Sequence, residues 1–128
     1  MSDPLTAWHR FVAERDIAYL DDLLDDNVSF RPPTYWKTRI GKPITMLILS
    51  SVMEIFEDFE YRRQWIDGGN WALEFSARIG DLALKGVDLI RLENNKIVDL
   101  EVLIRPPNAI NALRHEMVTR LAALGGAW

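Results

Sequence analysis

The sequence contains the stretch Lys85-Gly86-Val87-Asp88-Leu89-Ile90-Arg91-Leu92, whose composition predicts a β-strand with apolar residues on both faces. Such strands are usually covered on both faces. A carboxylate in one of them is costly to bury unless it is hydrogen-bonded, protonated or open to a cavity. Asp88 therefore predicts a hollow or polar pocket at this point and is the leading candidate for a functional residue.

The alternation of the same strand places Leu84, Gly86, Ile90 and Leu92 on the face that carries Asp88. If this face lines the interior, the carboxyl stands in an apolar pocket, as a general acid/base or as a protonated donor to a substrate carbonyl. The alternative is a buried carboxylate that pairs with an arginine for structural reasons, which perturbs its pKa as strongly.

Composition narrows the classes of protein. The 128 residues correspond to one domain, 1–128, and the absence of cysteine excludes disulfides, thiol nucleophiles and thiolate metal sites. A net charge of −4 with scattered basic residues argues against nucleic-acid binding. Residues 1–4 lack a signal-peptide pattern, and the longest apolar segment, 44–56, is too short to span a bilayer. We therefore expect a cytoplasmic protein with no membrane partner.

Helical periodicity predicts helices over residues 4–14, 16–24, 43–56 and 108–124. Ser2 or Asp3 is expected to cap the first helix and Asn108 the last, and Gly125-Gly126 is expected to end the last helix. The apolar stripe of this last helix consists of Ile110, Leu113, Met117, Leu121 and Leu124.

Strand patterns and turn residues predict strands over residues 28–31, 59–66, 71–79, 82–92 and 97–105, with a loop over 34–42. Three helices and a short strand thus precede four consecutive strands and a final helix. This order is typical of an α+β domain in which helices pack on one face of an antiparallel sheet.

The layout resembles the nuclear-transport-factor-2-like superfamily and, within it, the SnoaL-like, ketosteroid-isomerase-like group. The resemblance covers the whole chain and rests on the order and spacing of Leu24-Asp25-Asp26-Asn27-Val28-Ser29-Phe30, Gly41-Lys42-Pro43-Ile44, Gly86-Val87-Asp88-Leu89-Ile90-Arg91-Leu92 and Lys96-Ile97. It implies a cone-shaped, curved antiparallel sheet packed by N-terminal helices around a pocket, and a homodimer formed through the open sheet face. This fold hosts isomerases, cyclases, dehydratases, hydrolases and non-enzymatic binders, so it does not by itself imply an activity.

The resemblance also implies residue roles. Val87-Asp88-Leu89 matches a segment of ketosteroid isomerases whose aspartic acid stays protonated and donates to an oxyanion; in SnoaL-like cyclases an aspartate at a comparable position is the acid/base. The base aspartate of those isomerases matches Arg31, and their oxyanion-hole tyrosine matches Trp8, beside His9. Because a guanidinium is no base, we do not expect classical ketosteroid isomerisation, and the base stays open.

Arg31 and His9 each allow two interpretations. Arg31 either binds a substrate carboxylate or ionises Asp88 from within ~4–6 Å, or it faces solvent at a strand end. His9 is either a neutral base or an exposed helix residue. His9 and His115 lie too far apart in the sequence to suggest a metal site.

Aromatic and aliphatic side chains are the candidates for a substrate-binding wall. Phe59, Tyr61 and Trp65 are predicted to share one strand face, and Tyr35 and Trp36 to form a lid. The alternatives for these rings are core packing and a dimer face. The candidate wall residues are Trp8, Tyr35, Trp36, Phe59, Tyr61, Trp65, Phe75, Val102 and Ile104.

The sequence thus favours a cofactor-free isomerase, cyclase or dehydratase that acts by proton transfer on a small apolar carbonyl compound. The alternative is a non-catalytic small-molecule-binding or dimerisation module of the same fold. An enzyme of this kind needs a second titratable or oxyanion-stabilising group close to Asp88, for which Arg31, His9 and Tyr61 are the candidates, whereas a binder does not.

Overall fold

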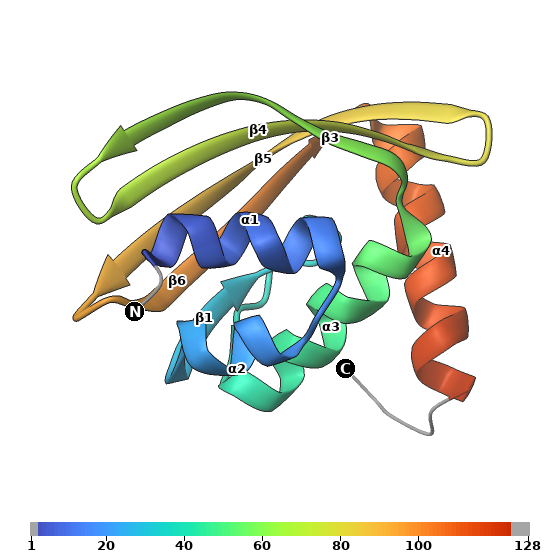
Figure 1. Ribbon diagram of the computed structural model, residues 1–128. Coiled ribbons are helices and arrows are strands. Elements are labelled where there is room, and N and C mark those ends of the chain that lie inside the picture. Colours follow the sequence, from blue (N-terminus) through green and yellow to red (C-terminus); the bar gives the residue numbers. More distant parts are fainter. Residues whose placement is uncertain (1–2, 124–128) are drawn as a thin grey trace.

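The computed structural model describes residues 3–123, which form a curved six-stranded sheet packed by helices (Figure 1). The strands are β1 (Leu24–Arg31), β2 (Arg39–Ile40), β3 (Glu57–Asp67), β4 (Asn70–Ile79), β5 (Leu82–Glu93) and β6 (Lys96–Arg105). The helices are α1 (Pro4–Glu14), α2 (Ala18–Leu23), α3 (Lys42–Ile55) and α4 (Pro107–Ala123).

The sheet has the strand order β2-β1-β6-β5-β4-β3. Strands β3 to β6 are consecutive antiparallel neighbours, as the sequence predicts. β1, however, pairs in parallel with β6, with Ser29 opposite Asp99, so the sheet is mixed and the prediction of a wholly antiparallel sheet is wrong at this pair. The direction of β1 depends on the path of the whole intervening chain, which no local pattern reveals. The α+β class and the curved sheet packed by helices are confirmed.

Two boundaries near β1 differ from the prediction for the same reason. β1 begins at Leu24 instead of Val28, because Leu24 pairs with Ile97 of β6. The two-residue strand β2 lies inside the predicted loop 34–42, where Ile40 pairs with Ser29. Both features depend on a partner strand rather than on local sequence.

The helix ends are set by local chemistry. The Thr6 amide donates to Asp3 Oδ2 at 3.3 Å, which caps α1 as predicted. α4 begins at Pro107, so Asn108 lies inside its first turn and is not its cap, since a proline is favourable at the first helical position. The expected roles of Ser2, Leu124 and Gly125-Gly126 fall outside the described residues.

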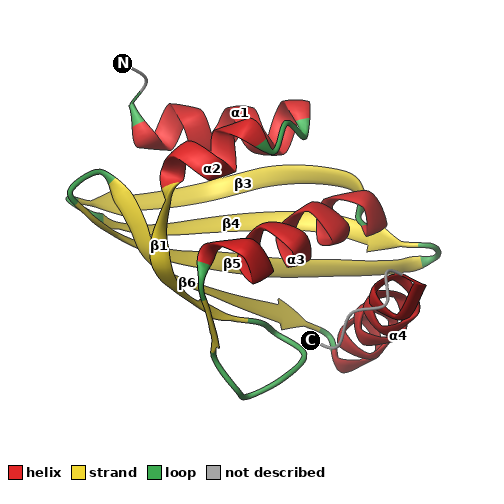
Figure 2. Ribbon diagram, turned by 90° about the horizontal axis from the view of Figure 1, so that it is seen from below, coloured by secondary structure: helices red, strands yellow, loops and turns green. Residues whose placement is uncertain are grey.

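The helices position a core on one side of the sheet. Helices α1, α2 and α3 lie over its concave face, and α4 lies at one end (Figure 2). On β5, the buried residues Leu84, Gly86, Asp88 and Ile90 alternate with more exposed ones, so the predicted inward face is confirmed at these positions. Over residues 3–123, no helix combines the length and the apolar character needed to cross a membrane.

Gly86 lets two neighbours approach the backbone of β5. A Cβ atom at this position would lie 2.4 Å from Cζ of Phe75 and 2.6 Å from the backbone oxygen of Leu103. The carbonyl belongs to a paired strand and cannot move away without disturbing the strand pairing. Gly86→Ala is therefore expected to lower the free energy of unfolding by about 1–3 kcal/mol in urea denaturation. Lys85→Ala, at the exposed neighbouring position, is the control, and equal stability of both variants would contradict this close packing.

Candidate active site

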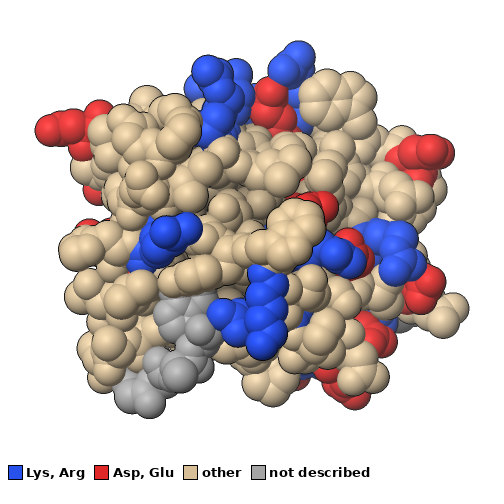
Figure 3. Space-filling model, turned by 180° about the vertical axis from the view of Figure 1, so that it is seen from behind, with Lys and Arg blue, Asp and Glu red and all other residues tan. Residues whose placement is uncertain are grey.

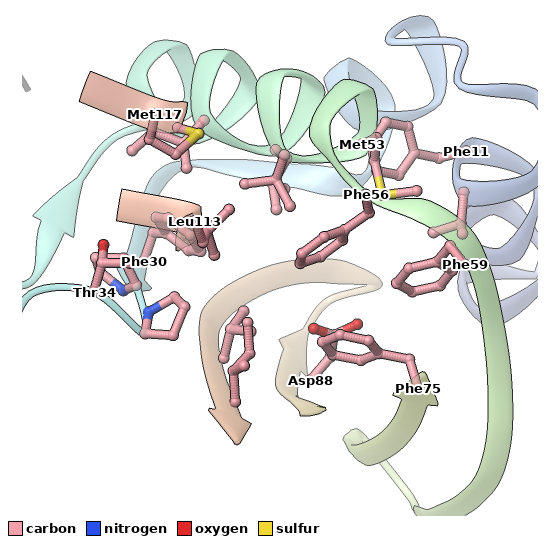
Figure 4. A pocket seen from close by; sticks show the side chains of 18 of the residues that line it. Phe11, Phe30, Thr34, Met53, Phe56, Phe59, Phe75, Asp88, Leu113 and Met117 are labelled. Carbon is pink, nitrogen blue, oxygen red and sulfur yellow. The ribbon is translucent and has the colours of Figure 1, made fainter. Parts of the chain in front are cut away.

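An apolar pocket lies between the sheet and helices α1, α3 and α4 (Figure 4). Its volume is about 50 Å³, counted as the space open to the centre of a water molecule. This is room for about three to five waters or one small molecule. Among the described lining residues, only Trp8, Thr34, Tyr61 and Asp88 bring a polar nitrogen or oxygen side-chain atom to the wall.

Asp88 supplies the only carboxyl among the described residues of this wall. Its side chain points into the pocket among the rings of Phe56, Phe59 and Phe75 (Figure 4), and the residue is 7% exposed. Burial raises the pKa of Asp88 from 3.8 to about 7, although a hydrogen bond from Tyr61 favours the ionised form and acts in the opposite direction. Both protonation states are therefore populated near neutral pH.

Tyr61 is the second polar group beside the carboxyl. It comes from β3, and its hydroxyl donates to Asp88 Oδ2 at 2.6 Å and accepts from Trp8 Nε1 at 2.8 Å. Burial and the adjacent charge of Asp88 hold the pKa of Tyr61 well above its ordinary value, so it stays protonated. Trp8, Tyr61 and Asp88 thus form a continuous chain of hydrogen bonds that ends in the pocket.

Stacked aromatic rings surround the hydrogen bonds between Trp8, Tyr61 and Asp88 and separate them from bulk water. The rings of Phe59 and Phe75 stack with centroids 5.0 Å apart, and the ring of Tyr61 stands perpendicular to that of Phe59, also at 5.0 Å. Phe56 extends the stack, with its centroid 6.0 Å from that of Phe59. This apolar surround is the physical cause of the raised pKa of Asp88.

Two solved structures resemble this chain over nearly its full length. The crystal structure of a steroid delta-isomerase from Pseudomonas aeruginosa has 43% sequence identity and a TM-score of 0.91, and the match covers 97% of this chain and 93% of that one. A protein with a cystatin-like fold from Silicibacter pomeroyi, described as uncharacterized, has 38% identity and a TM-score of 0.90, with 95% and 87% of the two chains covered. This chain belongs to the nuclear-transport-factor-2-like superfamily.

More distant relatives share the fold alone. An NTF2-like protein of unknown function from Burkholderia xenovorans has 22% identity and a TM-score of 0.70, and the match covers 81% of each chain. Neither a family model nor a curated protein matches the sequence. Within the NTF2-like superfamily, the similarity to a steroid delta-isomerase places the chain with the ketosteroid-isomerase-like proteins.

Arg31, which matches the base aspartate of ketosteroid isomerases, does not line the pocket. Its guanidinium is half exposed and pairs with Asp99, with Nη2 3.1 Å from Oδ1. No ion pair joins an arginine of residues 3–123 to Asp88, whose side chain accepts from Tyr61 instead. Of the two interpretations of Arg31, the contact with Asp88 is therefore absent, and the half-exposed position at the end of β1 agrees with the other.

His9 lies behind Tyr61 rather than in the pocket wall. Its Nε2 is 3.2 Å from Gln64 Oε1, and its ring stands perpendicular to the ring of Tyr61 with centroids 5.1 Å apart. His9 packs against the ring of Tyr61, and it does not line the pocket that holds Asp88.

The predicted common face of Phe59, Tyr61 and Trp65 is broken by a β-bulge. Tyr61 lies opposite Phe75 but Gln64 lies opposite Leu73, so β3 has one extra residue between these pairs. The extra residue reverses the alternation, and Trp65 turns to the outer sheet face, 53% exposed beneath the guanidinium of Arg63. Trp65 therefore does not line the pocket.

The aromatic residues of the loop after β1 also lie outside the pocket. Trp36 is 98% exposed, and Tyr35 lies beneath the guanidinium of Arg114 at 5.2 Å. The preceding residues Pro32, Pro33 and Thr34 reach the pocket instead. The other predicted wall residues do line it: Trp8, Phe59, Tyr61, Phe75, Val102 and Ile104.

Sequence reasoning missed the contribution of α3 and α4 to the wall. Val52 and Met53 of α3 and Leu113 and Met117 of α4 line the pocket. For Leu113 and Met117 the signal was the apolar stripe of the last helix, which predicts a buried face but cannot distinguish core from pocket. In residues 3–123, no three His, Cys, Asp or Glu side chains come together in a way that could hold a metal ion.

Proposed function

We propose that the chain is a cofactor-free isomerase, cyclase or dehydratase that acts by proton transfer on a small, apolar carbonyl compound. One observation carries the proposal: the Asp88 carboxyl, with a pKa of about 7, stands in an apolar pocket and takes a 2.6 Å hydrogen bond from Tyr61. A general acid or base works best when its pKa lies near the operating pH.

Each protonation state of Asp88 has a chemical role. The carboxylate removes a proton from the carbon next to the carbonyl, and the electron pair of the broken C–H bond moves onto the carbonyl oxygen as an enolate. The resulting carboxylic acid then returns the proton to another carbon of the conjugated system, and the electron pair forms the new C–H bond. One carboxyl thus completes an isomerisation, so no second base is needed where Arg31 stands paired with Asp99.

The similarity at 43% identity to a protein named a steroid delta-isomerase supports this class of chemistry. The substrate is a separate matter, because a pocket of about 50 Å³ surrounded by packed rings favours a compound smaller than a steroid. Thr34, which is 5% exposed, is the polar wall residue on the side of Phe30 and Leu113, away from Asp88 (Figure 4).

The competing function is a non-catalytic binding module of the same fold. This function is favoured because the described pocket wall contains no second carboxyl and no histidine or lysine. Tyr61 favours the enzyme, since its hydroxyl donates to one oxygen of the Asp88 carboxyl and so holds this group in place for proton transfer.

Proton exchange separates the two functions. The protein is mixed with small cyclic ketones and enones in D2O, and the loss of the proton signal next to the carbonyl is followed by NMR. Saturable exchange above the buffer rate is expected of the enzyme. Shifts of pocket resonances without exchange would support the binding module. The absence of both exchange and resonance shifts would contradict both functions.

The homodimer stays a prediction. Seen from behind, the molecule shows broad uncharged areas between small groups of charged side chains (Figure 3). Leu103 and Trp65, which point away from the pocket, are 50% and 53% exposed and are compatible with burial in a partner.

A further inference from the structure

Trp8 connects α1 to the pair of Asp88 and Tyr61. The indole is 2% exposed, and its Nε1–H donates to the Tyr61 hydroxyl at 2.8 Å. An indole nitrogen is a donor only, so the Tyr61 oxygen must be the acceptor in this contact. The single hydroxyl proton of Tyr61 is therefore left for Asp88 Oδ2, 2.6 Å away.

The direction of the hydrogen bond from Tyr61 makes the two oxygens of the Asp88 carboxyl different. Oδ2 accepts from Tyr61, so a protonated Asp88 carries its own proton on Oδ1. Within residues 3–123, no side chain other than Tyr61 donates a hydrogen bond to the Asp88 carboxyl. Oδ1 is thus the oxygen left for a ligand in the pocket, as a donor in the acid and as a base in the carboxylate.

The other groups packed around Tyr61 hold its ring but do not orient its hydroxyl. The rings of His9 on α1 and Phe59 on β3 both stand perpendicular to it, with centroids 5.1 Å and 5.0 Å away. His9 contacts Gln64 instead of the hydroxyl. Among the described residues, Trp8 is the hydrogen-bond partner of the Tyr61 hydroxyl besides Asp88, and it occupies the oxygen of that hydroxyl as a donor.

We propose that Trp8 is a positioning residue, which directs the Tyr61 hydroxyl at Asp88 Oδ2 and so reserves Oδ1 for proton exchange with the ligand. The proposal rests on the proposed function, because the ligand is the carbonyl compound. Without the indole donor, the Tyr61 hydroxyl can rotate into the pocket and donate to the ligand or to water. Asp88 then loses its partner for part of the time, and its protonated oxygen is no longer defined.

The first test is Trp8→Phe, which keeps an aromatic ring but removes the donor. The rate of exchange at saturating ketone is expected to fall about 3- to 10-fold, as for the loss of one neutral hydrogen bond. The pKa of Asp88 should rise further, because the bond from Tyr61 that stabilises the carboxylate is weakened. Trp71→Phe is the matched control, since Trp71 is 6% exposed and does not line this pocket.

A double variant tests whether Trp8 acts through Tyr61. Tyr61→Phe removes both hydrogen bonds of the chain, so adding Trp8→Phe to it is expected to change neither the exchange rate nor the pKa of Asp88 further. An equal effect of Trp8→Phe in both backgrounds would overturn the proposal and leave Trp8 a packing residue.

The wild-type protein provides a test that needs neither a variant nor a turnover. The indole N–H resonance of Trp8 is expected to shift with pH at the midpoint of the Asp88 titration, whereas that of Trp71 is not. A Trp8 resonance that ignores the Asp88 titration would overturn the positioning role. If the wild-type protein exchanges no ketone proton, the proposed function fails, and this titration still decides the role of Trp8.

Discussion

Asp88→Asn is expected to lower the rate of ketone proton exchange by at least about 100-fold, the smaller end of what one positioned acid/base contributes. An amide neither takes up nor releases a proton at accessible pH. It has nearly the shape of the acid, and its oxygen can still accept from Tyr61, so the fold and the pocket should be retained. NMR exchange rates and a thermal denaturation curve of the same sample check both expectations.

Asp99→Asn is the matched control, because it makes the same substitution outside the pocket, where the carboxyl pairs with Arg31. Its exchange rate should equal that of the wild-type protein. Full activity of Asp88→Asn would exclude the acid/base role. Activity lost together with the folded state would instead indicate that Asp88 is needed for structure.

The second large effect is on the pH dependence of stability. The pKa of Asp88 is about 7 in the folded protein, against 3.8 for an unperturbed carboxyl. The folded state therefore holds this proton more tightly, and its stabilisation is fully present below pH 3.8 and is lost as the pH rises through 7. With 1.36 kcal/mol for each pH unit, the loss amounts to about 4 kcal/mol.

Asp88→Asn removes this loss. The free energy of unfolding of the variant minus that of the wild type is expected to rise by about 4 kcal/mol between pH 4 and pH 8, measured by urea denaturation. Glu74→Gln is a contrasting control, because Arg63 lowers the pKa of Glu74 to about 2. That stabilisation is present above about pH 4.5 and is lost only as the pH falls towards 2, so its effect lies in another pH range. A constant difference between Asp88→Asn and the wild type from pH 4 to 8 would contradict the burial of an ionisable Asp88.

The elements that sequence could predict are those with a local signal. The period of two along β5 places Asp88 on the inward face, and helical periodicity over residues 4–14 predicts α1, which carries Trp8. The meander from β3 to β6 follows from turn residues between alternating strands. These features depend on near neighbours, so the expected elements and the family resemblance agree with the structure.

What sequence could not predict depends on contacts between distant segments. The bulge between Tyr61 and Gln64 reverses the face of Trp65, and it is visible only in the pairing of β3 with β4. Arg31 finds Asp99 because β1 lies beside β6 in parallel. Tyr61 was one of three candidate partners of Asp88 in the sequence, and its contact with the carboxyl depends on the order β5-β4-β3, which places the two residues two strands apart in the sheet.

The measurement that bears most directly on the site is the pH titration of the Asp88 carboxyl carbon by NMR, in the free wild-type protein. We expect a midpoint near pH 7, because burial among the rings of Phe56, Phe59 and Phe75 outweighs the hydrogen bond from Tyr61. A midpoint at or below the usual 3.8 would mean that the carboxyl is solvated or paired with a cation. It would contradict the proton-transfer site and favour the binding module.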